Sequence, residues 1–271
     1  MRPLFPVVFL LTASILHGCG RQADTPSNVQ APGEPTSPKT SLLEGGAAAL
    51  QTKRPIDAIN TYLDGFHFYN GQQDVQMEAH HYCSTVNEDA IQCVIYDGNM
   101  RDAKLMGVEY IISAKLFATL DAAEKALWHS HVSEVKSGQL VAPGIPEAAE
   151  KELMKKLVGT YGKTWHTWHT DLHKQLPLGV PQLMMGFTGK AQARHAMVAE
   201  RDNRMKVDSE AKRKARSDIP SPSPDPLADG WQYGNVYQPH DPQPHDPQPH
   251  DPQPHDPTAE GRTKLHSPSR P

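Results

Sequence analysis

Two neighbouring stretches in the middle of the chain combine apolar with polar residues in short, strand-like runs. Residues 78–86 read EAHHYCSTV and residues 90–97 read AIQCVIYD, with a short polar stretch at 87–89 between them. Runs of this length, rich in β-branched and aromatic residues and joined by a polar turn, predict a β-hairpin. Residues 103–113, AKLMGVEYIIS, have the same character and predict a third strand.

Two other stretches repeat their apolar residues at helical spacing. Residues 55–70 begin with a proline, and Ile56, Ile59 and Leu63 follow three or four positions apart, which predicts a helix. Residues 146–161 also begin with a proline, carry acidic residues in the first turn and lysines further on, and are followed by a glycine. These are the signals of a second helix. Extended structure is predicted for residues 129–135, 138–143, 163–168 and 181–187.

The order of these elements predicts the fold class. Strands and helices do not alternate as βαβ units, so we expect an α+β fold, a single domain with a mostly antiparallel sheet and several packed helices. Only five of the 25 prolines lie within residues 55–190, which are therefore assigned to the domain. We expect disordered flanks on both sides of it.

The C-terminal flank divides into two parts by composition. Residues 191–218 are charged and compatible with a helix, and residues 219–271 are a tail rich in proline and histidine. Within that tail the pentapeptide QPHDP occurs four times in succession, from residue 238 to residue 257. Proline at two positions in five forbids both a helix and a sheet ladder, so the tail is expected to be disordered.

The N-terminus has the features of a secretory signal. Residues 1–18 hold one basic residue and a short apolar run, and they end in Leu16-His17-Gly18 before Cys19. This ending resembles a bacterial lipobox, which implies cleavage before Cys19 and its acylation. Residues 19–54 would then be a lipidated flexible tether. The alternatives are a plain secreted protein or an uncleaved signal.

The lipobox resemblance also implies a location and partners. Gly20 follows the cysteine, and lipoprotein sorting rules then favour the outer membrane. We expect a bacterial cell-envelope protein that faces the periplasm and is held by its lipid anchor. Its partners would be the membrane, a lipid or another envelope protein. The formal net charge of −4 gives no signature of nucleic-acid binding.

Six motifs in a fixed order carry a family resemblance. They are AHHYC, GVEYIIS, LWHSH, SGQLVAPGIPEAAEKELM, YGKTWHTW and LPLGVPQLMMGF, which run from residue 79 to residue 187. Together they make the chain similar to the oil-body-associated protein family, a domain of unknown function. The resemblance implies a role in the structure of lipid droplets, as in plant seeds, and it implies no reaction.

Histidine and glutamate residues gather in three segments of the matching region and suggest a metal site. Two histidines separated by one residue project from the same face of a strand, as beta-rich metal sites require. Such a set suits zinc or non-haem ferrous iron as a cofactor. The alternative is that these side chains are hydrogen-bonded within the core, and His67 and His173 are interpreted as structural. The candidate ligands are His80, His81, Glu109, His129, His131, Glu134 and His166.

Cys83 and Cys93 are ten residues apart across the predicted hairpin. A hairpin can bring two such residues opposite each other, within reach of a disulfide. They are therefore a possible disulfide, and the alternative is two free thiols packed in the core.

Two functional hypotheses follow from these features. The first is a membrane-anchored lipoprotein of the oil-body-associated family that acts without catalysis at a lipid surface or as a binding protein. The second is a metal-dependent enzyme of unknown substrate that uses the histidine and glutamate residues with zinc or iron. No hydrolase triad or phosphate-binding loop is recognisable, so the sequence favours the non-enzymatic hypothesis and assigns no catalytic residue.

Overall fold

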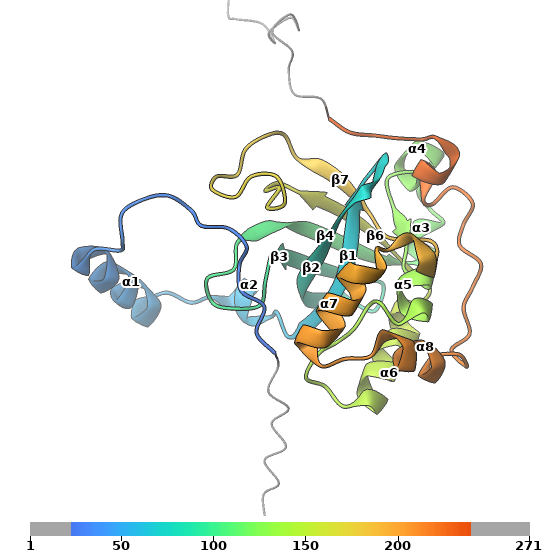
Figure 1. The fold of residues 1–271 in the computed structure, drawn as a ribbon, viewed down its shortest axis with the longest axis horizontal. Coiled ribbons are helices and arrows are strands. Elements are labelled where there is room, and N and C mark those ends of the chain that lie inside the picture. Colours follow the sequence, from blue (N-terminus) through green and yellow to red (C-terminus); the bar gives the residue numbers. More distant parts are fainter. Residues whose placement is uncertain (1–22, 240–271) are drawn as a thin grey trace, which may run out of the picture. The chain divides into compact units, whose positions relative to one another are not determined.

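The computed structural model describes residues 23–239. The predicted signal peptide, Cys19 and the repeats from His240 onwards lie outside the described residues. Within the described range, strands dominate the centre of the fold and helices lie around them (Figure 1).

Seven antiparallel strands form one sheet. Their order is β4-β3-β2-β1-β7-β6-β5, and a further pairing joins β4 to β6. That pairing closes six of the strands into a barrel, and the short strand β5 lies along β6 beside β7. The strands are β1 (Thr61–Tyr69), β2 (Gln72–Asn87), β3 (Ala90–Tyr96), β4 (Leu105–Ser113), β5 (His129–Ser130), β6 (Thr160–His166) and β7 (Gln182–Met185).

The α+β class predicted from the sequence is wrong. Its sheet with helices packed on it is replaced by a closed barrel, because β4 pairs with β6 along its whole length, from Gly107 opposite His166 to Ser113 opposite Thr160. About fifty residues separate these two strands in the sequence. Local patterns report which residues form strands, but they carry no information on which distant strands pair.

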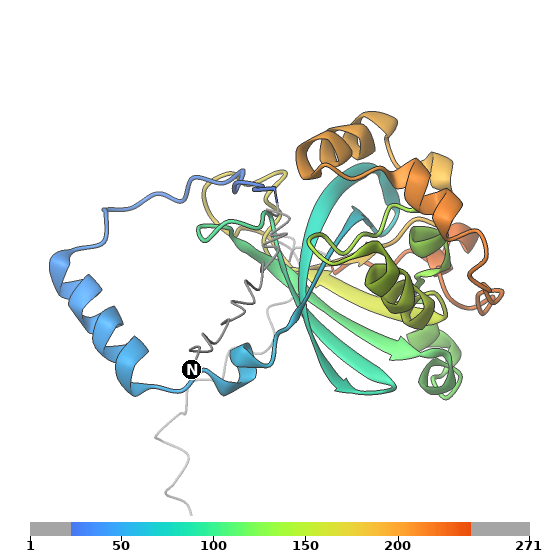
Figure 2. The same ribbon diagram turned by 90° about the horizontal axis from the view of Figure 1, so that it is seen from below.

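The helices are short and lie outside the barrel (Figure 2). None of the helices within residues 23–239 is long and apolar enough to cross a bilayer. They are α1 (Pro38–Leu50), α2 (Arg54–Asp57), α3 (Ala114–Phe117), α4 (Ala122–Lys125), α5 (Val132–Ser137), α6 (Glu147–Leu157), α7 (His195–Met205) and α8 (Ser209–Ala215), with 3₁₀ helices at Lys190–Gln192 and Gly230–Tyr233.

The helix predicted for residues 55–70 is also wrong. Only α2 is helical there, and β1 occupies Thr61–Tyr69 at the centre of the barrel wall. From Leu63 onwards every residue of β1 is buried, because α7 and a neighbouring loop cover the outer face. A strand buried on both faces loses its period-two alternation, so its apolar residues fit a helical spacing by chance.

An apolar cluster covers one end of the barrel. Val135 of α5 and Met154 and Leu157 of α6 pack there against Leu63 of β1 and the half-cystine Cys83 of β2. All five side chains are buried. This cluster excludes water from the barrel interior next to it, where polar side chains lie.

Residues on the C-terminal side of position 190 also pack on the barrel. Arg201 of α7 is buried against β1, and Trp231 stacks edge-on against Phe68 with ring centroids 4.9 Å apart. Asp229 accepts a hydrogen bond from the backbone N–H of Ser130. The described part of the predicted tail therefore contributes to the packing of the barrel, at least as far as residue 238, whose side chain bonds to the backbone of β7.

Candidate metal centre

Titratable side chains fill the middle of the barrel interior. Alternate residues of a strand point to one side, and register places His81 of β2 and Glu109 of β4 on the face that points inward. His67 of β1 and His166 of β6 face the same space, and their ring nitrogens lie 3.4 Å apart although β7 separates the two strands. All four side chains are buried. Buried polar groups are costly unless they are paired, so a polar interior of this kind needs a reason.

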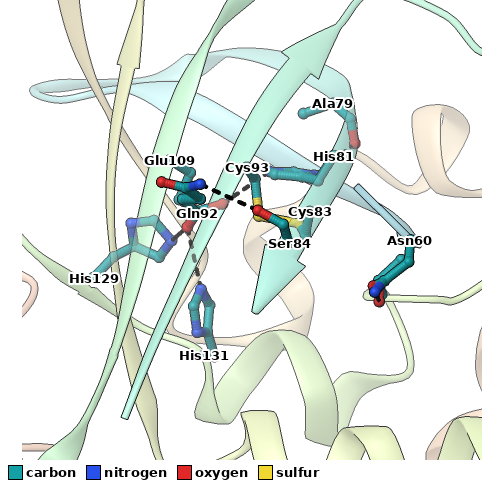
Figure 3. The surroundings of a disulfide bond; sticks show 11 residues. Asn60, Ala79, His81, Cys83, Ser84, Gln92, Cys93, Glu109, His129 and His131 are labelled. Carbon is teal, nitrogen blue, oxygen red and sulfur yellow. Dashed lines mark hydrogen bonds and ion pairs between the residues drawn. A yellow bond between two sulfur atoms is a disulfide. The ribbon is translucent and has the colours of Figure 1, made fainter. Parts of the chain in front are cut away.

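Glu109 lies at the centre of the contacts in this cluster (Figure 3). Its Oε2 is 3.0 Å from Nε2 of His81, and its Oε1 is 3.3 Å from Nε2 of both His129 and His131. Glu134 approaches from the other side, with Oε2 3.8 Å from Nε2 of His131 and 4.0 Å from Nε2 of His129. Three imidazoles and two carboxylates therefore converge on one small volume.

Three of these groups come from residues 129–134, where strand β5 is followed directly by helix α5. His129 lies in β5, His131 is the N-cap of α5, and Glu134 follows in the first turn of α5. The extended structure predicted for residues 129–135 is thus limited to two residues. The two histidines still meet at Glu109, because the turn into the helix swings His131 towards the barrel axis.

Burial lowers the pKa values of the histidines in this cluster, whereas the nearby carboxylates raise them. Burial lowers the pKa of His67 well below its ordinary value and that of His166 to about 3. Burial also lowers the pKa of His129, but its contact with Glu109 outweighs this and raises the value to about 9. In return, the three imidazoles close to Glu109 outweigh its burial and hold its pKa well below its ordinary value. The carboxylates thus make this volume attractive to a cation.

His80 and His81 project from opposite faces of β2, as neighbours in a strand do. His80 lies outside the barrel, with Nδ1 3.2 Å from Asp64 and Nε2 3.4 Å from Glu78. Those carboxylates already pair with Arg201 and Arg204 respectively. His80 is therefore part of a charged network beneath α7 and not part of the inner cluster.

The candidate ligands predicted from the sequence separate into three places. His166 reaches the inner cluster only through His67, which sequence reasoning had interpreted as structural, and His80 lies outside. In the register of β1 with β2, His67 projects from the same face of the sheet as His81. His67 would therefore have been a candidate if β1 had been recognised as a strand. The structure brings together His81, Glu109, His129, His131 and Glu134.

Cys83 and Cys93 form a disulfide beside this cluster (Figure 3). They are direct partners in the β2–β3 register, with Cα atoms 4.0 Å apart. Cys93 is in turn the register partner of Glu109 in β4, and Cys83 lies two positions beyond His81 on the same face of β2. The disulfide therefore ties β2 to β3, and β3 is the strand next to the one that carries the central carboxylate.

The fold and the cluster define a class of protein: a closed antiparallel barrel with a buried histidine and carboxylate cluster at its centre. A family model described as a protein of unknown function (DUF1264) matches residues 53–220. The chain belongs to this family, whose members include the oil body-associated proteins. No solved structure matches the chain.

Plant proteins are among the close relatives. The chain is 44% identical to oil body-associated protein 1B of Arabidopsis thaliana over 210 residues, which are 77% of this chain and 87% of that protein. It is 42% identical to oil body-associated protein 1A of Zea mays over 200 residues, 74% of this chain and 84% of that protein. These relatives contradict the predicted location in a bacterial outer membrane, because they are plant proteins named for oil bodies.

Proposed function

We propose that this protein acts at a lipid surface without catalysing a reaction, and that acyl chains on Cys19 help to hold it there. The oil body-associated names of its relatives support a lipid surface as the place of action. The lipobox-like sequence before Cys19 supports acylation. Each methylene buried in lipid contributes about 0.8 kcal/mol, so two or three acyl chains make attachment effectively permanent.

One structural relationship carries the proposal: the N-terminal segment is bound to the end of the barrel that exposes leucines. Thr25 and Asn99 exchange hydrogen bonds, with the backbone N–H of Asn99 donating to the carbonyl of Thr25 at 2.9 Å. The N–H of Gln30 donates to the carbonyl of Lys174 at 3.0 Å. Lys174 belongs to the loop 171–180, in which Leu172, Leu176 and Leu178 are 62%, 47% and 52% exposed.

These contacts hold Thr25 and Gln30, on the C-terminal side of Cys19 in the sequence, beside the barrel and the loop 171–180. Cys19 precedes Thr25 by six residues in the sequence, and an extended chain spans at most about 3.6 Å per residue. A lipid surface that receives the acyl chains is thus within reach of the loop 171–180. Each leucine transferred fully from water to hydrocarbon contributes about 1.5–3 kcal/mol to the attachment.

The first test concerns Cys19. Wild-type protein and Cys19→Ala would be produced in a bacterial host with radiolabelled palmitate, and membranes would be washed at high salt. Label should enter the wild type, and Cys19→Ala should appear as folded protein in the wash. Cys19→Ala that stays with the membranes would contradict anchoring through this residue.

The second test concerns the loop and uses purified, unacylated Cys19→Ala protein. It would be floated with triolein droplets coated with phosphatidylcholine. Changing Leu172, Leu176 and Leu178 to serine should reduce flotation. The matched control changes three exposed leucines of α1 to serine and should leave flotation unchanged; these are Leu42, Leu43 and Leu50. Equal effects of the two triple changes would contradict a specific lipid-facing loop.

The inner cluster favours a second candidate function, a metal-dependent enzyme that uses zinc or iron. An enzyme needs space for a substrate beside its metal. The cavity that His81, Glu109 and Glu134 line has a volume of about 10 Å³, which is the space of roughly one water molecule. A buried cluster with so little room supports a binding or structural role better than turnover of a substrate.

A further inference from the structure

We infer that the centre of the barrel binds one divalent transition-metal ion, zinc or ferrous iron. The inference is independent of the lipid-surface function. The ligands are three imidazole nitrogens and one carboxylate, from His81, His129, His131 and Glu109, with Glu134 beside them as a further oxygen donor.

The separations of the donor atoms are those of ligands that share an ion. Zinc lies about 2.0–2.1 Å from imidazole nitrogen and carboxylate oxygen, so neighbouring ligands of a tetrahedral site are roughly 3.3 Å apart. Nε2 of His129 and Nε2 of His131 are each 3.3 Å from Oε1 of Glu109. Nε2 of His81 is 3.0 Å from the other oxygen of the same carboxylate. An ion held by both oxygens of Glu109 would have His129 and His131 beside one oxygen and His81 beside the other.

In His81 and His131, the hydrogen bond made by Nδ1 fixes the tautomer of the ring. Nδ1 of His81 lies 3.1 Å from the carbonyl of Ala79, which can only accept, so this nitrogen carries the proton. Nδ1 of His131 lies 2.8 Å from Oγ1 of Thr160, whose own hydroxyl proton is donated to the carbonyl of Leu157. That hydroxyl oxygen must therefore accept from His131. In both neutral rings the lone pair is on Nε2 and points at Glu109, as in metal sites with second-sphere support.

Lone pairs that face a carboxylate repel it unless a cation lies between them. Within residues 23–239, Nε2 of His81, Nε2 of His129 and Oε2 of Glu134 are buried without a hydrogen-bond partner. His81 and Glu109 are close but not in hydrogen-bond geometry. A single ion would satisfy all of these atoms at once. Its two positive charges would balance the two carboxylates, Glu109 and Glu134.

The backbone leaves room at the same point. Gly162 of β6 lies between His129 and β4, and a Cβ atom there would be 2.0 Å from Oε1 of Glu109. The same atom would be 2.8 Å from Nε2 of His129 and from Nε2 of His131. Any side chain at this position would therefore enter the centre of the donor set. The cavity of about 10 Å³ in the cluster has space for one water-sized particle.

The donor types determine the class of ion. Magnesium and calcium prefer oxygen ligands, whereas three imidazoles with one carboxylate suit zinc or ferrous iron. The competing arrangement contains no ion: two of the histidines would be protonated and would balance the two carboxylates by themselves. The two arrangements differ in metal content, and this makes them distinguishable.

The test is elemental analysis of the untagged full-length protein, purified without chelators. We expect about one equivalent of zinc or iron per chain, and Glu109→Gln should lower the bound metal at least tenfold. His195→Ala, at an exposed histidine of α7, should bind as much as the wild type. A full-length variant with His240, His245, His250 and His255 changed to alanine should also keep the metal, which excludes the repeats as its site.

A spectroscopic measurement covers the case in which a ligand variant does not fold. Wild-type protein freed of metal and then given Co²⁺ should show the intense visible absorption of a low-coordinate histidine and carboxylate site. Wild-type protein without stoichiometric metal and without this cobalt spectrum would overturn the inference in favour of protonated histidines. Metal that is lost with the four repeat histidines, but kept in Glu109→Gln, would overturn it as well.

Discussion

Arg201 of α7 and Asp64 of β1 form an ion pair in which neither side chain has any exposed surface. Nη1 of the arginine lies 2.5 Å from Oδ1 of the aspartate. The guanidinium also donates to Asp202 at 2.8 Å and to Ser209 at 3.0 Å, and it stacks on the ring of Phe66 at 4.7 Å. Because each of its three nitrogens donates a hydrogen bond, this one side chain fixes α7 and the start of α8 to the barrel wall.

The first prediction is that Arg201→Ala destabilises the protein by about 3–5 kcal/mol, because it leaves the Asp64 carboxylate buried without its partner. Urea unfolding of the variant at neutral pH measures the loss. Lys115→Ala is the control, since Lys115 pairs with Asp89 at the surface and such pairs contribute little. A loss in Arg201→Ala no larger than that in Lys115→Ala would contradict the anchoring role of Arg201.

The second prediction concerns the pH dependence of stability at Glu78, in the network outside the barrel. Burial and the nearby Asp64 raise the pKa of Glu78 from 4.5 to about 7. The folded state thus keeps a proton that the unfolded state has lost, so this group reduces stability as the pH rises from 4.5 to about 7. Burial has the opposite effect on His80: it lowers the pKa to about 4, so stability rises with pH between about 4 and 6.5.

Glu78→Gln should therefore remove the contribution of Glu78, which lowers stability as the pH rises. The contribution of His80, which raises stability with pH, should remain. The free energy of unfolding of the variant, minus that of the wild type, should increase by about 3 kcal/mol between pH 4.5 and 7. Urea unfolding of both proteins across this range measures the difference. A difference that stays constant or falls with pH would show that the ion pair with Arg204 keeps Glu78 charged throughout.

The third prediction is that reduction of the Cys83–Cys93 disulfide lowers the melting temperature without unfolding the protein. The bond closes a loop of about ten residues, which contributes roughly 2–3 kcal/mol in the chain-entropy model. The β2–β3 ladder and the closed barrel remain after reduction. Thermal unfolding with and without a dithiol reductant measures the change.

Thiol counting tests the premise of that prediction. It would use denatured protein kept from reductant, in the Cys19→Ala background, so that only two cysteines are counted. Cys83→Ala combined with Cys93→Ala should melt like the reduced protein. Two free thiols, or a melting temperature that reductant does not change, would contradict a disulfide in solution.

Local patterns predicted several elements of the barrel but not its closure. The hairpin predicted from residues 78–97 is present as β2 and β3, and the helix predicted for 146–161 is present as α6. The strands β2 and β3 could be recognised because both runs are short, carry β-branched and aromatic residues, and meet at a polar turn. The pairing of β4 with β6 has no local signal, and β1 lost its alternation because both of its faces are buried.

The inner cluster was predictable in composition but not in detail. Spacing alone brought His129 and His131 to one site, and they do meet at Glu109. The choice between His80 and His81 depends on which face of β2 points inward, and only the register with β1 decides it. His67 could not be found without recognising β1 as a strand, since its partners come from β2, β5 and β6.

The fourth prediction is that Gly162→Ala destabilises the protein and lowers its metal content. Gly162 has ordinary backbone geometry, so the effect comes from space: the new Cβ would lie 2.0 Å from Oε1 of Glu109. The glutamate or the strand must shift, and such overpacking costs about 1–3 kcal/mol. The control is Gly159→Ala, whose Cβ would be at an ordinary 3.6 Å from Pro222. Urea unfolding and elemental analysis of both variants measure the two effects. If Gly162→Ala were as stable as Gly159→Ala and bound as much metal, the space at the centre of the cluster would not be needed for an ion.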